Sequence, residues 1–105
     1  MSAVTLAGST VDLDEEGFLT DAGQWNRDIA VEIARSEGIE PLTDRHWQVI
    51  DYMRKTYLNT GSAPSIRSLG KSSGVPIKEL YAIFPKGPAK VAAKIGGIPK
   101  PRGCI

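Results

Sequence analysis

Two stretches with apolar residues at helical spacing dominate what this chain can fold into. In the first, Trp25, Ile29 and Ile33 recur every four residues, so their side chains would share one face of a helix. Asp21, with a glutamine three residues later, forms a capping-box pattern that starts this helix. We therefore predict a helix over residues 21–36.

The second stretch predicts a longer helix. Thr43 is a suitable N-cap, and Asp44 places a negative charge in the first turn, where the helix dipole favours it. The residues from Asn59 to Gly61 end the helix. The expected buried stripe consists of Trp47, Ile50, Met53, Tyr57 and Leu58.

Shorter elements flank these helices. Residues 4–13 alternate apolar and polar side chains around an Ala-Gly turn, which predicts a β-hairpin that needs to pack on the helices. Beyond Pro64, turn residues separate short helices over about 65–71, 77–84 and 88–95, and the first two resemble a helix-turn-helix unit. We predict a mainly α fold, with the hairpin packed on an orthogonal bundle of about five helices.

The C-terminal segment has a different character. Gly96 and Gly97 end the last helix, and two prolines exclude helix or central strand beyond it. We predict one domain over residues 1–97 and a flexible, extended C-terminal arm over residues 98–105, with hinges at both glycines and at Gly103. Deleting the arm is expected to leave the fold intact.

Composition excludes several classes of protein. With 105 residues, the chain is long enough for one compact domain. Its apolar runs are too short to span a membrane, and its first residues lack the pattern of a secretion signal. A single cysteine excludes an internal disulfide and is typical of a cytoplasmic protein. Zinc-finger and phosphate-loop motifs are absent, so we expect no metal and no cofactor.

Charge is distributed unevenly along the chain. Residues 1–60 contain five Lys or Arg and eleven Asp or Glu, whereas residues 61–105 contain eight Lys or Arg and one Glu. A basic half of this kind usually contacts an anionic partner. Alternatively, the two halves attract each other within one fold, and charge alone does not decide between these interpretations.

The only cysteine, Cys104, is next to last in the chain. The Pro-rich segment before it could hold the thiol roughly 20 Å from the domain. Nearby cations stabilise a thiolate and so raise its reactivity. The candidates for thiolate support or partner docking are Lys86, Lys90, Lys94, Lys100 and Arg102. The first three are spaced as a row along the last predicted helix, and an inert tail is the alternative interpretation.

Several motifs resemble those of a known family. The segments FPKGPAK (84–90) and GIPKPRGCI (97–105) are similar to the C-terminal signature of the DsrC/TusE family. Agreement extends to DEEGFL (14–19), Trp25, LTDRHW (42–47) and an Ala-Pro-x-x-Arg pattern ending at Arg67. The resemblance covers nearly the whole chain. Members include the gamma subunit of dissimilatory sulfite reductase and the sulfur-relay protein of tRNA 2-thiouridine synthesis.

The resemblance implies a role for Cys104, because the penultimate cysteine of the family carries sulfur as a persulfide. Members that serve sulfite reductase have a second cysteine in the last helix, whereas the matching position here is Ala93, so no internal disulfide or trisulfide can form. The chain also lacks an extra segment of those members, since Gly74 and Phe84 are only ten residues apart. Both departures favour a one-cysteine carrier of the TusE type. Arg67 matches the family pattern and is expected to orient the arm and its thiolate or dock a partner; membership of an ion pair is the alternative.

The expected partners are a sulfur-donor relay protein and an acceptor such as a tRNA thiolase, with sulfite reductase as the alternative. We expect no membrane contact and only indirect contact with nucleic acid. The protein would be a sulfurtransferase-type carrier rather than a stand-alone enzyme, and His46 is expected to cap or pack. A nucleic-acid-binding helix-turn-helix is the alternative from another class, because Arg67, Lys71 and Lys78 could contact phosphates. The second helix of that unit has few base-reading side chains, which argues against it.

Overall fold

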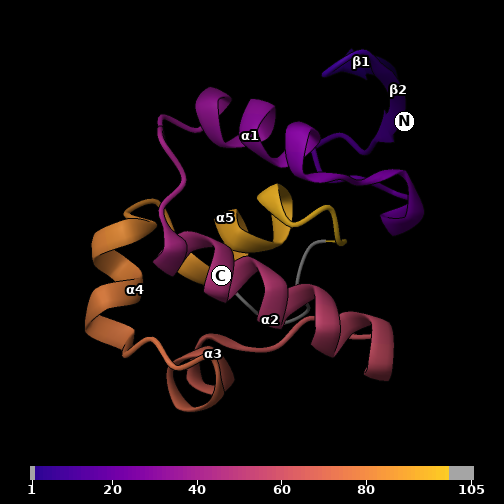
Figure 1. Ribbon diagram of the computed structural model, residues 1–105. Helices are drawn as coiled ribbons and strands as arrows, with labels where there is room; N and C mark the ends of the chain where they lie inside the picture. Colours follow the sequence, from indigo (N-terminus) through magenta and orange to yellow (C-terminus); the bar gives the residue numbers. More distant parts are fainter. Residues whose placement is uncertain (1, 100–105) are drawn as a thin grey trace.

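The computed structural model describes residues 2–99, so Cys104, Lys100, Arg102 and Gly103 lie outside the described residues. The elements are β1 (Ser2–Leu6), β2 (Ser9–Leu13), the 3-10 turn η1 (Ala22–Gln24), α1 (Arg27–Ser36), α2 (Asp44–Thr60), α3 (Ile66–Ser72), α4 (Ile77–Ile83) and α5 (Pro88–Ile95). The predicted fold class is confirmed: a mainly helical chain with an N-terminal hairpin (Figure 1). Within the described range, none of the helices has the length and apolar character needed to cross a membrane.

Helix α5 lies at the centre of the fold. It contacts each of the other four helices, and Figure 1 shows it between α1 and α2. Its alanines, Ala89, Ala92 and Ala93, are buried and allow the neighbouring helices to approach closely. Val91 and Ile95 are buried with them. Because other elements enclose α5 on most sides, its backbone position is fixed, and so is the point from which its few exposed side chains extend.

The hairpin forms as predicted. Ala7 and Gly8 both have positive φ, 50° and 81°, which is the turn geometry that matches the twist of two paired strands. Val11 of β2 is fully buried in the core. The side chain of Gln24 accepts a hydrogen bond from the backbone N–H of Asp12 at 2.8 Å, and this bond fastens the hairpin to η1.

The helix predicted over residues 21–36 is wrong in its first part, where only the short turn η1 forms. The backbone becomes extended at Asn26 (φ −149°, ψ 176°), and the Asn26 side chain accepts a hydrogen bond from the N–H of Ile29 at 2.9 Å. This N-cap starts α1 as a separate helix. Ile29 and Ile33 are buried as predicted, but Trp25 leaves the helical face and contacts the end of α5.

The buried stripe of α2 is shorter than predicted. Ile50 and Met53 are fully buried, as is Val49, whereas Leu58 is exposed. Leu58 lies in the C-terminal turns of α2, which extend beyond α5 (Figure 1), whereas Trp47 and Tyr57 of the predicted stripe are partly buried against the core. On α4, Leu80 occupies the inward position and is fully buried, and Tyr81 is exposed.

The end of the described chain stays in the core. Ile98 is fully buried, and its N–H donates to the carbonyl of Ala93 at 3.1 Å. Although Ile98 falls within the predicted arm, the fold holds the chain at least as far as this residue. Deleting residues 98–105 would therefore remove a core side chain, at a cost of about 2–5 kcal/mol.

Candidate functional site

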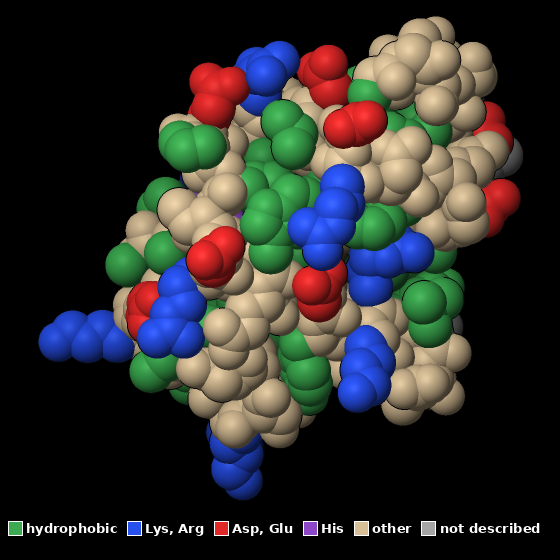
Figure 2. Space-filling view, in the orientation of Figure 1, with side chains coloured by type: hydrophobic (Ala, Val, Ile, Leu, Met, Phe, Trp, Pro, Cys, Tyr) green, Lys and Arg blue, Asp and Glu red, His purple; other side chains and the backbone are tan. Residues whose placement is uncertain are grey.

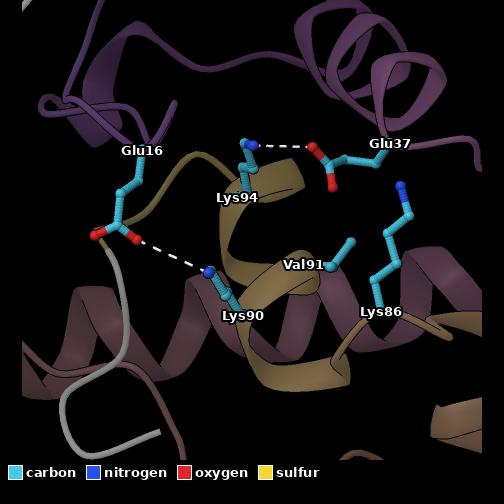
Figure 3. Close-up of a pocket in the computed structure, with 6 residues that line it drawn as sticks. All are labelled: Glu16, Glu37, Lys86, Lys90, Val91 and Lys94. Carbon is cyan, nitrogen blue, oxygen red and sulfur yellow. Dashed lines mark hydrogen bonds and ion pairs between the residues drawn. The ribbon is translucent and has the colours of Figure 1, made fainter. Parts of the chain in front are cut away.

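Three lysines and two carboxylates surround an open pocket beside α5. The pocket has a volume of about 390 Å³ and is lined by Glu16, Glu37, Lys86, Lys90, Val91 and Lys94 (Figure 3). Lys90 and Lys94 project from α5, Glu16 comes from the turn after β2, and Glu37 follows α1. Lys86 lies in the turn before α5, so the lysine row predicted along one helix is only partly correct.

Ion pairs cross this pocket. Lys94 Nζ lies 2.8 Å from Glu37 Oε2, and only 23% and 18% of the two side chains is exposed. Lys90 Nζ lies 3.9 Å from Glu16 Oε2 in a more exposed pair. Lys86 forms no ion pair with any described residue, and Figure 3 shows its side chain directed toward the Glu37 side of the pocket. Lys86 therefore supplies the positive charge of the pocket that no described carboxylate balances.

These ion pairs bear on whether the acidic and basic halves of the chain attract each other within the fold. Both pocket carboxylates come from the acidic half of the chain and both paired lysines from the basic half. Arg45 and Glu79 pair across the halves in the opposite sense, at 3.0 Å. The two halves thus attract each other within the fold. Arg67, Lys71 and Lys78 are exposed and form no ion pair with a described residue.

Two side chains that we call the α5 clamp, Trp25 and Arg54, hold the C-terminal end of α5. The indole N–H of Trp25 donates to the carbonyl of Ile95, and Arg54 Nη1 donates to the carbonyl of Gly96, both at 2.8 Å. The Arg54 guanidinium also stacks over the Trp25 ring, 4.1 Å from its centroid. Carbonyls that the end of a helix leaves unpaired are therefore satisfied by two distant segments.

The Arg54 side chain is partly buried and therefore partly desolvated. Burial lowers the pKa of Arg54 from its ordinary value, and the negative charge of Asp51 partly offsets this effect. The guanidinium nevertheless remains charged at neutral pH, because arginine loses its proton only in strongly alkaline solution. Its Nη2 also donates to the carbonyl of Ala22 at 3.3 Å, so the same cation joins η1, α2 and α5.

Two of the predicted hinge glycines, Gly96 and Gly97, are buried at the clamp. Gly97 has a φ of 68°, and a Cβ at this position would lie 2.6 Å from Cγ and 2.7 Å from Cβ of Trp25. A residue with a side chain would therefore meet both backbone strain and the indole ring. A hinge at these glycines stays a prediction, while the structure assigns Gly97 a packing role.

His46 has the structural role that the sequence predicts. Its Nδ1 accepts a hydrogen bond from the N–H of Thr43 at 3.0 Å, and its Nε2 lies 2.9 Å from the carbonyl of Ile83. A neutral ring with the proton on Nε2 makes both bonds. The ring also packs edge-on against Phe84, with centroids 5.1 Å apart. Across residues 2–99, no group of three or more His, Cys, Asp or Glu side chains could hold a metal ion.

Comparison with known proteins places this fold among sulfur-metabolism proteins. The family model described as "DsrC like protein" matches residues 5–105. The chain is 39% identical to the dissimilatory-type sulfite reductase subunit gamma of Nitratidesulfovibrio vulgaris, over 100% of both chains. It is 43% identical to the sulfurtransferase TusE of Escherichia coli, with 93% of this chain and 95% of the relative covered. The sequence predicts that this chain lacks a segment between Gly74 and Phe84 that sulfite reductase subunits carry. The match to the Nitratidesulfovibrio vulgaris subunit covers all of both chains, so this difference does not distinguish the two proteins.

Solved structures agree with the sequence comparison. A crystal structure of dissimilatory sulfite reductase I (DsrI) is similar with a TM-score of 0.89 and 39% identity, covering 99% of this chain and 100% of that chain. The oxidized gamma-subunit (DsrC) from Archaeoglobus fulgidus is similar with a TM-score of 0.83 and 34% identity, again covering 99% and 100%. By its sequence and by its fold, this chain belongs to the DsrC-like family, in which the named relatives are a sulfite reductase subunit and a sulfurtransferase.

Proposed function

We propose that this protein carries sulfur as a persulfide on Cys104 within a protein sulfur relay. The observation that carries this proposal is the position of its only cysteine, five residues beyond Pro99 in a member of a sulfur-relay family. The α5 clamp and buried Ile98 fix the point from which this segment starts. Five residues of extended chain reach at most about 18 Å from that point. A thiol on such a tether can meet a partner without a pocket of its own.

Transfer would proceed by thiol–persulfide exchange. The Cys104 thiolate attacks the terminal sulfur of a donor persulfide, an S–S bond to Cys104 forms, the donor's S–S bond breaks, and the donor leaves as a thiolate. An acceptor thiolate then takes the terminal sulfur from Cys104 in the same way and releases the Cys104 thiolate. Each exchange moves one sulfur atom and needs no external oxidant or reductant.

Cations would support the thiolate form of Cys104. Lys100 and Arg102 are within four residues of it in sequence, and Lys86 has no carboxylate partner among the described residues. Positive charge near a thiol lowers its pKa and increases the reactive fraction at neutral pH. We assign thiolate support to these three residues, and contact with a partner to Arg67, which is exposed on α3.

A one-cysteine mechanism favours a relay of the TusE type. Ala93, at the position where the resemblance implies a second cysteine in other members, is fully buried in α5. With a single thiol, the protein cannot release sulfur by closing an internal disulfide and has to pass it to an acceptor thiol. We therefore propose a tRNA thiolase as the final acceptor. Dissimilatory sulfite reductase is the second candidate, which the end-to-end match to its gamma subunit supports.

Sulfur loading tests the proposal directly. The protein is incubated with glutathione persulfide, and its intact mass is measured before and after treatment with dithiothreitol. We expect the gain of one sulfur atom, its removal by the reductant, and no gain in Cys104→Ser. Circular dichroism checks that this variant is folded. A chain that gains no sulfur, or a Cys104→Ser variant that still gains it, contradicts the proposal.

A second experiment separates the two relays. Protein loaded with radioactive sulfur is mixed with a purified tRNA thiolase or with dissimilatory sulfite reductase, and the labelled protein is identified after gel filtration. Transfer to the thiolase supports the TusE-like relay, whereas a labelled complex with sulfite reductase supports the second candidate. A control variant lacks residues 100–105. The deletion begins at residue 100 rather than 98, because this keeps Ile98 in the core.

A further inference from the structure

The outer face of α4 carries two exposed apolar side chains one turn apart. Ile77 is 43% exposed and Tyr81 is 52% exposed. Among the described residues, the other exposed large hydrophobic side chain is Leu58 on α2. Isolated apolar side chains are common on protein surfaces, but residues four apart on a helix lie side by side. These two therefore form a continuous apolar patch.

Gly70 extends this patch onto α3. A Cβ at Gly70 would lie 2.9 Å from Cδ1 of Ile77, so the Ile77 side chain rests against the bare backbone of α3. Ile77 thus connects the exposed surfaces of the two helices. We call the combined surface the α3–α4 face; it consists of Arg67, Lys71, Ile77, Lys78 and Tyr81.

The charged residues of the α3–α4 face are all basic. Arg67 and Lys71 are one turn apart on α3, Lys78 is on α4, and none of the three pairs with a described carboxylate. The single carboxylate within these two helices, Glu79, is bound to Arg45. Figure 2 shows basic side chains projecting from this side of the molecule. The face therefore differs from the α5 pocket, where two lysines are paired with glutamates.

We propose that the α3–α4 face docks an acidic protein surface with an apolar side chain at its centre, and that this partner is a protein of the sulfur relay. The assignment to the relay rests on the proposed function. An apolar centre within a polar rim is the usual anatomy of a protein interface, in which Tyr and Arg are enriched. Unbalanced positive charge selects a negatively charged partner and accelerates association.

Nucleic acid fits this face less well than an acidic protein does. Ile77 and Tyr81 occupy the centre, where a phosphate backbone would need cations or amide donors. The other exposed residues of α4 are Lys78 and Ala82. Apart from Lys78 and Glu79, of which Glu79 is bound to Arg45, helix α4 contains none of the polar side chains that commonly read base edges in the major groove.

Site-specific cross-linking in the cells that produce the protein tests the proposal. A photoreactive phenylalanine analogue replaces Tyr81 in one variant and Leu58 in a matched control, since both are exposed apolar residues. We expect the variant at position 81 to form an adduct with one protein through a segment rich in Asp and Glu. The control at position 58 is expected to form no such adduct.

Binding measurements with the purified partner then test the charge argument. Reversing Lys71 and Lys78 to glutamate is expected to raise the dissociation constant about tenfold, with a smaller effect at high salt. Lys55→Glu is the matched control, because Lys55 is exposed on α2 and has no ion pair with a described residue. The partner is also expected to take sulfur from the Cys104 persulfide.

Several results would overturn the proposal: equal adducts at positions 58 and 81, an adduct with nucleic acid, or a dissociation constant that charge reversal leaves unchanged. The adduct should also form with Cys104→Ser, because docking does not use the thiol. If Cys104 takes up no sulfur while the adduct forms, the proposed function fails and the docking surface survives. If Cys104 takes up sulfur but no adduct forms at position 81, the docking surface fails alone.

Discussion

Replacing Gly97 with alanine is expected to destabilise the fold by about 2–4 kcal/mol, through two separable effects. The left-handed backbone, with a φ of 68°, costs a residue that has a Cβ about 1–2 kcal/mol. The new Cβ would also lie 2.6 Å from Cγ of Trp25, so the indole has to move. That movement weakens its hydrogen bond to Ile95 and its stacking with Arg54, each worth about 1 kcal/mol.

The matched control is Gly38→Ala. Gly38 has a similar φ of 80°, but a Cβ placed there has no heavy atom within 4 Å, so only the backbone cost of about 1–2 kcal/mol applies. Urea unfolding followed by tryptophan fluorescence measures the free energy of unfolding of both variants. Gly97→Ala should lose about 1–2 kcal/mol more than Gly38→Ala. Equal losses would refute the inference that the packing of Trp25 requires glycine at position 97.

A double-mutant cycle tests the same mechanism. Trp25→Ala removes the ring that the new Cβ would meet, so adding Gly97→Ala to that variant should cost only the backbone term. The expected coupling energy between the two positions is about 1–2 kcal/mol, which corresponds to the contacts that the indole makes with α5. If Gly97→Ala costs as much without the indole as with it, the steric obstacle is not Trp25.

Two further predictions concern buried polar pairs. His46→Ala should cost about 2–3 kcal/mol, because it uncaps the N–H of Thr43 and leaves the Ile83 carbonyl unpaired; thermal unfolding measures this, and an unchanged melting temperature would contradict the capping role. Lys94→Met should cost about 1–3 kcal/mol, because it leaves the mostly buried Glu37 carboxylate without its ammonium partner. Adding Glu37→Leu should restore most of that loss in urea unfolding, and a double variant as unstable as the single one would show that the unpaired carboxylate is not the cause.

Elements with local signals were predictable from the sequence. The Ala-Gly hairpin turn and the start of α2 after Thr43 depend on residues within a few positions of each other, and both form where expected. The sequence does not indicate the break at Asn26, because Trp25 continues the helical spacing of the residues that follow it. Trp25 instead bonds to Ile95, 70 residues later, and no local pattern reports a contact of that kind.

In the candidate site, too, features with a local sequence signal were predictable and features that depend on tertiary contacts were not. The pocket lysines were predicted from charge and spacing, but Glu16 and Glu37 join them only because α5 packs near the ends of β2 and α1. Arg54 lies in the middle of α2, where a single arginine is typical of a solvated helix face, and only the tertiary fold shows that it closes the end of α5. Periodicity predicts a buried stripe on α2 as far as Leu58, which is exposed, because periodicity does not indicate where a neighbouring helix ends.

The burial of Ile98 also has a mechanical consequence. A partner that grips the residues beyond Pro99 would pull on the main chain, and tension would reach Ile98 before any turn of α5. The enclosed Ile98 side chain and the bond from its N–H to Ala93 would resist that force, with the bonds of Trp25 and Arg54 next in line. Repeated binding and release of that segment by a partner would therefore leave the helices intact.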